Sequence, residues 1–290
     1  PLPPRLPRLF GILTNNPNRL AGYLAALVPV IIAWALTMRT RLTRAALLAI
    51  AAGSVLSVGL TFSRGGFLSL AVSLPTLTIL LLFGLPGLRA KAVQTARDWR
   101  AVAGGAALLA AGVPIFIRWA SVREWRIDAA RLDIWRSAWL AGLDRPLTGL
   151  GPDAFGRARR LFGDPWAALE HIDHAHNAVL SVWAEGGLLG VTALAILISG
   201  LVTAAIAHWR RSQGADRIRL VGVLAGLAGY AAHSLFDLIF SAAPHRTAQM
   251  FVVVTLAAYV AMPLDPPTRP ERSRRPALAP ALALALLALA

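Results

Sequence analysis

Residues 45–83 read AALLAIAAGSVLSVGLTFSRGGFLSLAVSLPTLTILLLF, and this stretch decides the fold. As one helix its 39 residues would be ~58 Å long, whereas the hydrocarbon core of a bilayer is only ~30 Å thick. The chain must therefore turn within the stretch. Its only polar break is Thr61-Phe62-Ser63-Arg64-Gly65-Gly66, where two glycines permit a turn. We predict two membrane spans, Ala45–Phe62 and Gly66–Phe83, joined by this break.

The rest of the chain has the same apolar character. Hydrophobic residues make up 57% of it and charged residues 15%, against about 25% charged residues in soluble proteins. Other spans are predicted at Leu20–Met38, Ala101–Trp119, Gly186–His208, Arg219–Phe240 and Ala248–Pro263, with a shorter apolar run from Pro276 to Ala290. The first residue is not methionine and the last run is too short to span, so we expect a fragment of a longer protein. The predicted fold is an all-α, polytopic transmembrane helical bundle of about seven to eight spans, the last one truncated.

The basic residues gather in alternate short loops. The rich loops hold Arg39, Arg41 and Arg44; Arg89, Lys91, Arg97 and Arg100; Arg210, Arg211, Arg217 and Arg219; and Arg269, Arg272, Arg274 and Arg275. The short loops on the opposite side hold only Arg64 and Arg246. The positive-inside rule places the rich side in the cytoplasm. Much of the net charge of +15 is thus a topology signal and does not indicate a nucleic-acid partner.

This topology divides the chain into three parts. Residues 1–119 hold four N-terminal spans, residues 120–177 form a periplasmic or extracellular loop domain, and residues 178–290 hold the C-terminal spans. In the loop domain, Ala129–Leu143 is predicted to form an amphipathic helix with Leu132, Trp135, Ala138 and Trp139 on one face. Two tryptophans on that face suit a helix in the lipid headgroup layer. Glycines at 149, 151 and 156 indicate a loop after it.

Titratable side chains concentrate at the end of the loop domain. Three of the six histidines, His171, His174 and His176, lie there, and Asn177 can cap the helix that follows. His176 is either a histidine in a cap region or a general base, since imidazole titrates near neutral pH. A metal site of His171, Asp173, His174 and His176 is the alternative, although this spacing matches no standard zinc pattern.

Three arginines are candidates for binding an anion. Arg64 lies between two spans, where it either snorkels to the interface or clamps phosphate oxygens with its guanidinium fork. Arg131 and Arg136 lie on the predicted amphipathic helix, where they either face solvent and headgroups or form a second clamp. Farther along, His233 and Asp237 are four residues apart on one predicted helix and would face the same way, as a structural pair or as part of a site.

The order of short motifs resembles the bacterial O-antigen ligase/polymerase-like family. The motifs are Arg8-x-x-Gly11, Asn16-Pro17-Asn18, Ser63-Arg64-Gly65-Gly66 (Ser-Arg-Gly-Ala in most of the family), Arg131 with Trp135, Pro146-Leu147-x-Gly149-x-Gly151, His174-Ala175-His176-Asn177 and Glu185-Gly186. Each motif alone is weak, and their order and spacing carry the resemblance, which extends from about Arg8 to Asp237.

The resemblance implies a GT-C-like, inverting membrane glycosyltransferase of the inner membrane, with its active site facing the periplasm or exterior. Such an enzyme moves a glycan from an undecaprenyl-diphosphate carrier to an acceptor hydroxyl and needs no cofactor or metal. By resemblance, Arg64 and Arg131 would hold the diphosphate and His176 would act on the acceptor. Arg136, His174, Asn177, Glu185, His233 and Asp237 would contribute to substrate binding.

Several alternatives remain open at this level. The acceptor could be lipid A-core, a growing glycan, a teichoic-type polymer or a protein, which would make the chain a ligase, a polymerase or a protein O-oligosaccharyltransferase. A non-enzymatic transporter of lipid-linked glycans is the rival class. A transporter is expected to show interrupted half-helices in an inverted repeat, and the sequence has no such repeat.

Overall fold

The computed structural model describes residues 9, 16–97, 129–163, 172, 174–236 and 247–262. Every regular element in this part of the chain is an α-helix. The helices are α1 (Pro17–Thr37), α2 (Arg41–Thr61), α3 (Arg64–Gly84), α4 (Pro86–Arg97), α6 (Ala129–Asp144), α7 (Phe155–Phe162), α8 (Ala178–Arg211), α9 (Gly214–Ser234) and α10 (Thr247–Ala261). The predicted all-α fold class is confirmed for these residues.

Among the described residues, four helices are long and apolar enough to cross a membrane: α1, α2, α3 and α8. They correspond to four of the predicted spans. The predicted span Ala248–Pro263 becomes α10, which has only 15 residues. The predicted span Ala101–Trp119, the final run from Pro276 and the fourth arginine-rich loop lie outside the described residues. The count of seven to eight spans therefore stays a prediction.

The predicted boundaries of Arg219–Phe240 are wrong. Helix α9 begins five residues earlier, at Gly214, and ends at Ser234. Its first turns tolerate arginine because the cations find partners there: Arg217 lies over the Trp209 ring and donates to the Trp209 carbonyl at 2.7 Å. Since α9 ends at Ser234, the argument that His233 and Asp237 share one helix face no longer holds.

The turn between α2 and α3 occurs where it was predicted, but the glycines do not form it. Phe62 has a φ of 50° and ends α2 in the left-handed conformation, and the Ser63 hydroxyl caps α3 by accepting from the Gly66 N–H at 3.2 Å. Gly65 and Gly66 instead lie buried in the first turn of α3. A Cβ on Gly66 would lie 2.5 Å from the Ala21 Cβ, so this glycine permits close packing of α3 on α1.

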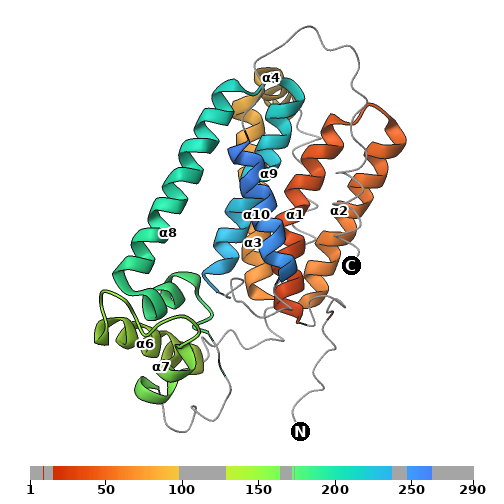
Figure 1. Cartoon of the computed structure of the whole chain (residues 1–290). Helices are drawn as coiled ribbons and strands as arrows, with labels where there is room; N and C mark the ends of the chain where they lie inside the picture. Colours follow the sequence, from red (N-terminus) through yellow and green to blue (C-terminus); the bar gives the residue numbers. More distant parts are fainter. Residues whose placement is uncertain are drawn as a thin grey trace, which may run out of the picture.

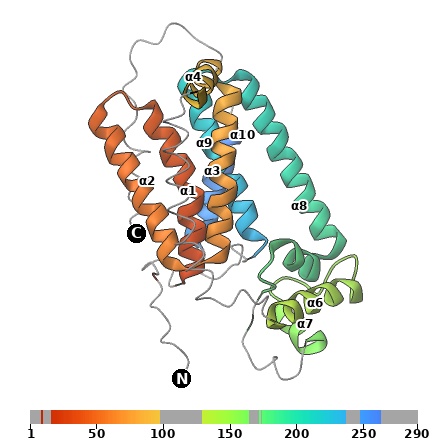
Figure 2. The ribbon, with the colours of Figure 1, turned by 180° about the vertical axis from the view of Figure 1, so that it is seen from behind.

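Helix α1 is the centre of the bundle, and most of its residues are buried against α2, α3 and α9 (Figures 1 and 2). The contact with α9 depends on small residues. A Cβ on Gly222 would lie 2.3 Å from the Ala33 Cβ, and one on Gly226 would lie 2.4 Å from the Ala26 carbonyl oxygen. Spacing glycines one helical turn apart lets two apolar helices approach closely where lipid provides no hydrophobic drive.

The two ends of the bundle differ in charge. The described arginine-rich segments, at 39–44, 89–97 and 210–219, all lie at the end that carries α4 (Figure 1). Arg64, the start of α8 and the end of α9 lie at the opposite end, beside α6 and α7 (Figures 1 and 2). The alternation of basic loops read from the sequence thus corresponds to a real separation in space.

Helix α6 has nearly its predicted length, but the four residues predicted to share one apolar face are divided between two sides: Ala138 is buried against the protein, whereas Leu132 and Trp139 are exposed. The buried residues are Ile134, Ser137, Ala138 and Ala141, whereas Leu132 and Trp139 are 52% and 53% exposed. The small side chains of Ser137, Ala138 and Ala141 let α7 and α8 approach α6. The larger apolar residues point away from this contact.

Candidate functional site

The site is built at the end of the bundle where α3 begins. Arg64 is the first residue of α3, directly after the Ser63 cap, and is half-buried. The next residue, Gly65, faces the His233 ring: a Cβ on Gly65 would lie 2.7 Å from the ring Nδ1. His233, in the last turn of α9, therefore packs against the residue that follows Arg64 in α3.

His233 is fully buried between two helices. Its ring lies against Gly65 of α3 and against Gly22 of α1, where an added Cβ would also lie 2.7 Å from ring atoms. Only glycine leaves room for an imidazole in both positions. This placement makes His233 a brace that joins α1, α3 and α9 next to Arg64. Its predicted contact with substrate stays a prediction.

The segment that holds His174, His176 and Asn177 also contacts the end of α9. Asn177 caps α8 by accepting from the Leu180 N–H at 3.0 Å, which confirms its predicted capping role. Its amide nitrogen also donates to the carbonyl of Leu235, just past the end of α9, at 3.1 Å. One side chain thus orients α8 and ties the segment to α9, two residues from His233.

His176 has an unusual backbone conformation. Its φ is 49°, a left-handed conformation that costs a residue other than glycine about 1–3 kcal/mol. The rings of His174 and His176 lie together, with centroids 4.2 Å apart. Both side chains are half-buried, and between them Ala175 is buried and donates its N–H to the Ser181 hydroxyl. The surrounding contacts hold the strained His176 in place, and strained residues of this kind concentrate at functional sites.

Helix α6 approaches the end of α9 through Trp135. The Trp135 and Phe236 rings have centroids 6.5 Å apart. Arg131 is four residues before Trp135 and shares its face of the helix, so it lies on the side of α6 that meets α9. Arg136 is about 140° around the helix from Arg131 and is exposed. Arg131 and Arg136, which the resemblance gave different roles, therefore lie on different sides of α6.

A backbone joint holds the loop after α6 to α8. The N–H groups of Leu150 and Gly151 donate to the carbonyls of Ala184 and Glu185, each at 2.9 Å. The N–H groups of Leu188 and Leu189 donate to the carbonyls of Pro146 and Leu147, at 2.7 and 3.1 Å. In a regular helix residues 188 and 189 would bond to residues 184 and 185, so the loop is inserted into the hydrogen-bond ladder of α8.

Two glycines make this Gly149–Gly187 joint possible. Gly187 has φ 56° and ψ −150°, which divides α8 at a kink, and Gly149 has φ 61°. A Cβ on either residue would lie 2.4–2.7 Å from backbone atoms of the other segment. Glu185 belongs to this joint and not to the histidine end: its carboxylate accepts from the Phe155 N–H at the start of α7, at 3.2 Å.

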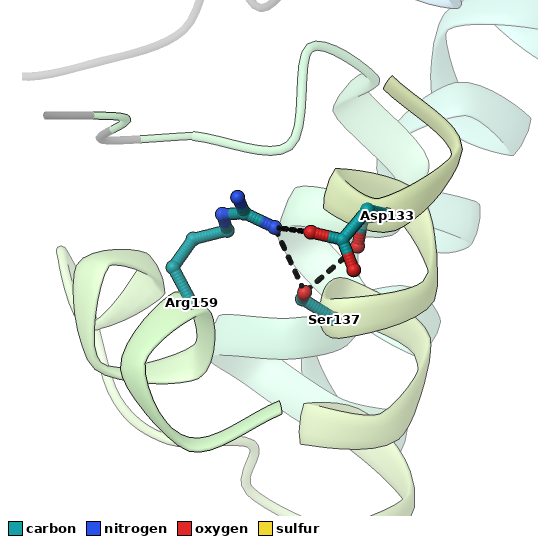
Figure 3. A network of polar contacts seen from close by, with 3 residues as sticks. All are labelled: Asp133, Ser137 and Arg159. Atoms are coloured by element: carbon teal, nitrogen blue, oxygen red, sulfur yellow. Dashed lines mark hydrogen bonds and ion pairs between the residues drawn. The ribbon is translucent and has the colours of Figure 1, made fainter. Parts of the chain in front are cut away.

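A buried ion pair joins α7 to α6. Arg159, only 3% exposed, donates from Nη1 to the Asp133 carboxylate and to the Ser137 hydroxyl at 3.2 Å (Figure 3). Ser137 in turn donates to the Asp133 carbonyl at 2.7 Å. Asp133 is two residues from Arg131, so the pair fixes the part of α6 that carries Arg131.

Some predicted site residues cannot be placed. Asp237, His171 and Asp173 lie outside the described residues. Within the described part of the chain, no group of three or more His, Cys, Asp or Glu side chains is arranged to hold a metal ion. The alternative metal site of His171, Asp173, His174 and His176 is therefore untested.

Comparison with known families identifies the family of the chain. Residues 10–195 match the family described as O-Antigen ligase. The chain belongs to the O-antigen ligase family. A comparison with curated proteins gives no match. Members of the O-antigen ligase family are glycosyltransferase-like ligases and polymerases, so the chain is a membrane enzyme of the O-antigen ligase or polymerase type.

Two parts of the site were not found from sequence. Arg159 was not singled out, although Phe155, Ala158, Arg159 and Phe162 follow helical spacing, and an arginine on an apolar face signals a buried partner. The Gly149–Gly187 joint was also missed. Gly149 belongs to the motif Pro146-Leu147-x-Gly149-x-Gly151, but Gly187, 38 residues later, directly follows the motif Glu185-Gly186 and was not singled out.

Proposed function

We propose that the protein transfers a glycan from an undecaprenyl-diphosphate carrier to an acceptor hydroxyl at the outer face of the cytoplasmic membrane. The observation that carries the proposal is the convergence on the end of α9. Gly65, next to Arg64, packs on His233; Asn177, next to His176, bonds to Leu235; and Trp135, four residues after Arg131, contacts Phe236. These three contacts support a site near the end of α9 to which Arg64, Arg131 and His176 contribute.

The arginines suit a diphosphate. Arg64 begins α3 and Arg131 lies in the first turn of α6. The N-terminus of a helix carries a partial positive charge, so a cation there is disfavoured and a bound anion is favoured. Guanidinium groups bind phosphate oxygens in pairs, and two of them would neutralise the charge that develops on a departing diphosphate.

His176 is proposed as the general base. The acceptor oxygen attacks the anomeric carbon as its proton moves to the His176 imidazole. The new C–O bond forms while the bond from the anomeric carbon to the diphosphate oxygen breaks, and the lipid diphosphate leaves with that electron pair. Attack from the face opposite the leaving group inverts the anomeric centre. His174 supports the base through ring contact, and Asn177 fixes the segment to α9.

A reconstituted transfer assay tests these roles. The full-length protein in proteoliposomes receives an undecaprenyl-diphosphate glycan and candidate acceptors, and single-turnover transfer and donor binding are measured. Arg64→Ala and Arg131→Ala should lose donor binding and transfer, and Arg64→Lys should also be poor because lysine lacks the paired fork. Arg157→Ala, an exposed arginine of α7, is the control. Near-normal transfer in both arginine variants would contradict the clamp.

A general-base role for His176 predicts a loss of transfer without a matching loss of donor binding. His176→Ala should reduce transfer about 10²–10⁴-fold while donor binding is largely kept, because the arginines remain. His174→Ala should reduce transfer less. Equal losses of binding and transfer in His176→Ala would mean that His176 holds the donor and does not accept the proton. The acceptor that supports turnover distinguishes a ligase from a polymerase or a protein O-oligosaccharyltransferase, and donor movement without transfer would indicate a transporter.

The proposed orientation is testable because the chain contains no cysteine. A cysteine at Thr40, at the arginine-rich end, should resist an impermeant thiol reagent applied to intact cells. A cysteine at the exposed Asp144, at the end of α6, should react. The reverse pattern would place the proposed site on the cytoplasmic side and would contradict transfer at the outer face of the membrane.

A further inference from the structure

Helix α6 carries an exposed apolar stripe on the side opposite its buried face. Leu132, Trp139 and Leu143 are each slightly more than half exposed. At 100° per residue they fall within about 40° of one another, and the buried residues Ile134, Ala138 and Ala141 lie on the other side. Such a stripe exposed to water would be costly, and the described residues leave about half of each of these side chains uncovered.

The stripe continues into the loop and into α8. Leu147, in the loop that follows α6, is 63% exposed, and the Gly149–Gly187 joint bonds its carbonyl to the N–H of Leu189. Leu188 and Leu189 are themselves more than half exposed and begin the long apolar part of α8. That part of α8 lies on the outside of the bundle, is long and apolar enough to cross a membrane, and exposes apolar side chains along its length (Figures 1 and 2).

The geometry and chemistry of α6 suit the same surroundings. The helix runs across the bundle axis beside the start of the long part of α8 (Figures 1 and 2). Trp139 packs on Trp183 of α8, with centroids 5.7 Å apart, and accepts a hydrogen bond from the Trp183 indole at its carbonyl. Arg136, in the middle of the stripe, is exposed. Tryptophan and arginine among leucines are typical of a helix at the level of lipid phosphates.

We propose that Leu132, Arg136, Trp139 and Leu143 of α6, together with Leu147, form a membrane-surface anchor that rests in the headgroup–acyl boundary of the bilayer. Lipid is the occupant because the surface is continuous with the lipid-facing side of α8 through a hydrogen-bonded joint. The anchor would hold α6, and with it Arg131, at a fixed depth whichever glycan the protein handles. This inference concerns the membrane and does not depend on the proposed transfer reaction.

Two neighbouring residues provide a matched test. Leu143 is on the stripe, and Asp144 is exposed about 100° away around the helix. Since the chain has no cysteine, Leu143→Cys and Asp144→Cys can each carry one nitroxide spin label in the full-length protein in lipid nanodiscs. Collisions with oxygen, which concentrates in lipid, and with a water-soluble nickel chelate then report the surroundings of each label.

The label at 143 should collide with oxygen at least severalfold more than with the nickel chelate, and the label at 144 should show the opposite preference. Leu132→Cys is a second stripe position that protects the test against a local defect at 143. Water-like collisions at both stripe positions would overturn the proposal. Shielding of both stripe labels from both reagents would also overturn it, since protein, such as a second copy of the chain, would then cover the stripe.

Discussion

Replacing Gly187 by alanine should open the joint between the α6–α7 unit and α8. The added Cβ would lie 2.6–2.7 Å from the Gly149 nitrogen, the Leu147 carbonyl carbon and the Pro146 oxygen. All three are backbone atoms, so no side-chain rotation relieves the contact. The backbone at Gly187, with φ 56° and ψ −150°, is also close to a region that essentially only glycine adopts.

The expected cost follows from these two effects. The backbone conformation contributes about 1–3 kcal/mol. If the loop moves away, the hydrogen bonds from Leu188 to Pro146 and from Leu189 to Leu147 are lost, at about 1 kcal/mol each. The sum is about 3–5 kcal/mol, which corresponds to a local opening equilibrium on the order of 10²–10³-fold more favourable, because ~1.4 kcal/mol is a factor of ten.

Hydrogen exchange measured by mass spectrometry on the protein in nanodiscs reads this opening directly. Peptides covering 146–151 and 184–190 should exchange on the order of 10²–10³-fold faster in Gly187→Ala, while peptides in α1 keep their protection. The matched control is Gly186→Ala, where an added Cβ meets no atom within 4 Å and alanine favours the helix. If the two variants exchange at similar rates, the glycine geometry does not hold the joint.

Three further predictions concern the site. Gly65→Ala should destabilise the bundle by about 1–3 kcal/mol in thermal unfolding, because its Cβ would overlap the buried His233 ring, and His233→Ala should restore part of the loss. Asp133→Ala should destabilise the α6–α7 unit by about 3–5 kcal/mol, measured by hydrogen exchange, because it leaves a buried arginine without its carboxylate. The double variant Asp133→Ala/Arg159→Leu should be destabilised by less than the sum of the two single changes, because no buried charge is then left unpaired. Transfer should survive EDTA, since arginines can neutralise a diphosphate; loss of activity restored by one divalent ion would favour a metal site.

Some parts of the site were readable from local sequence. Asn177 was expected to cap a helix, and it does so, because capping needs only a side-chain oxygen at the right offset. Arg64 was expected between two spans and begins α3. By contrast, the apolar face of α6 was assigned from the helical spacing of its apolar residues. The face that α6 buries is the one whose side chains are small enough to let α7 and α8 approach. Which face this is depends on how α7 and α8 pack against α6, and the sequence of α6 alone does not specify it.

The amino-acid sequence by itself determined the all-α class, the positions of the apolar helices and the grouping of arginines at one end, because hydropathy, helical spacing and loop charge are local properties. Only the tertiary structure decided that His233 packs against Gly22 and Gly65, that α6 contacts the end of α9 through Trp135, and that Gly149 and Gly187, 38 residues apart, form one joint. These features depend on close contacts between backbone and side chains from separate helices. Such contacts arise only when the helices pack, so no single segment of the sequence encodes them.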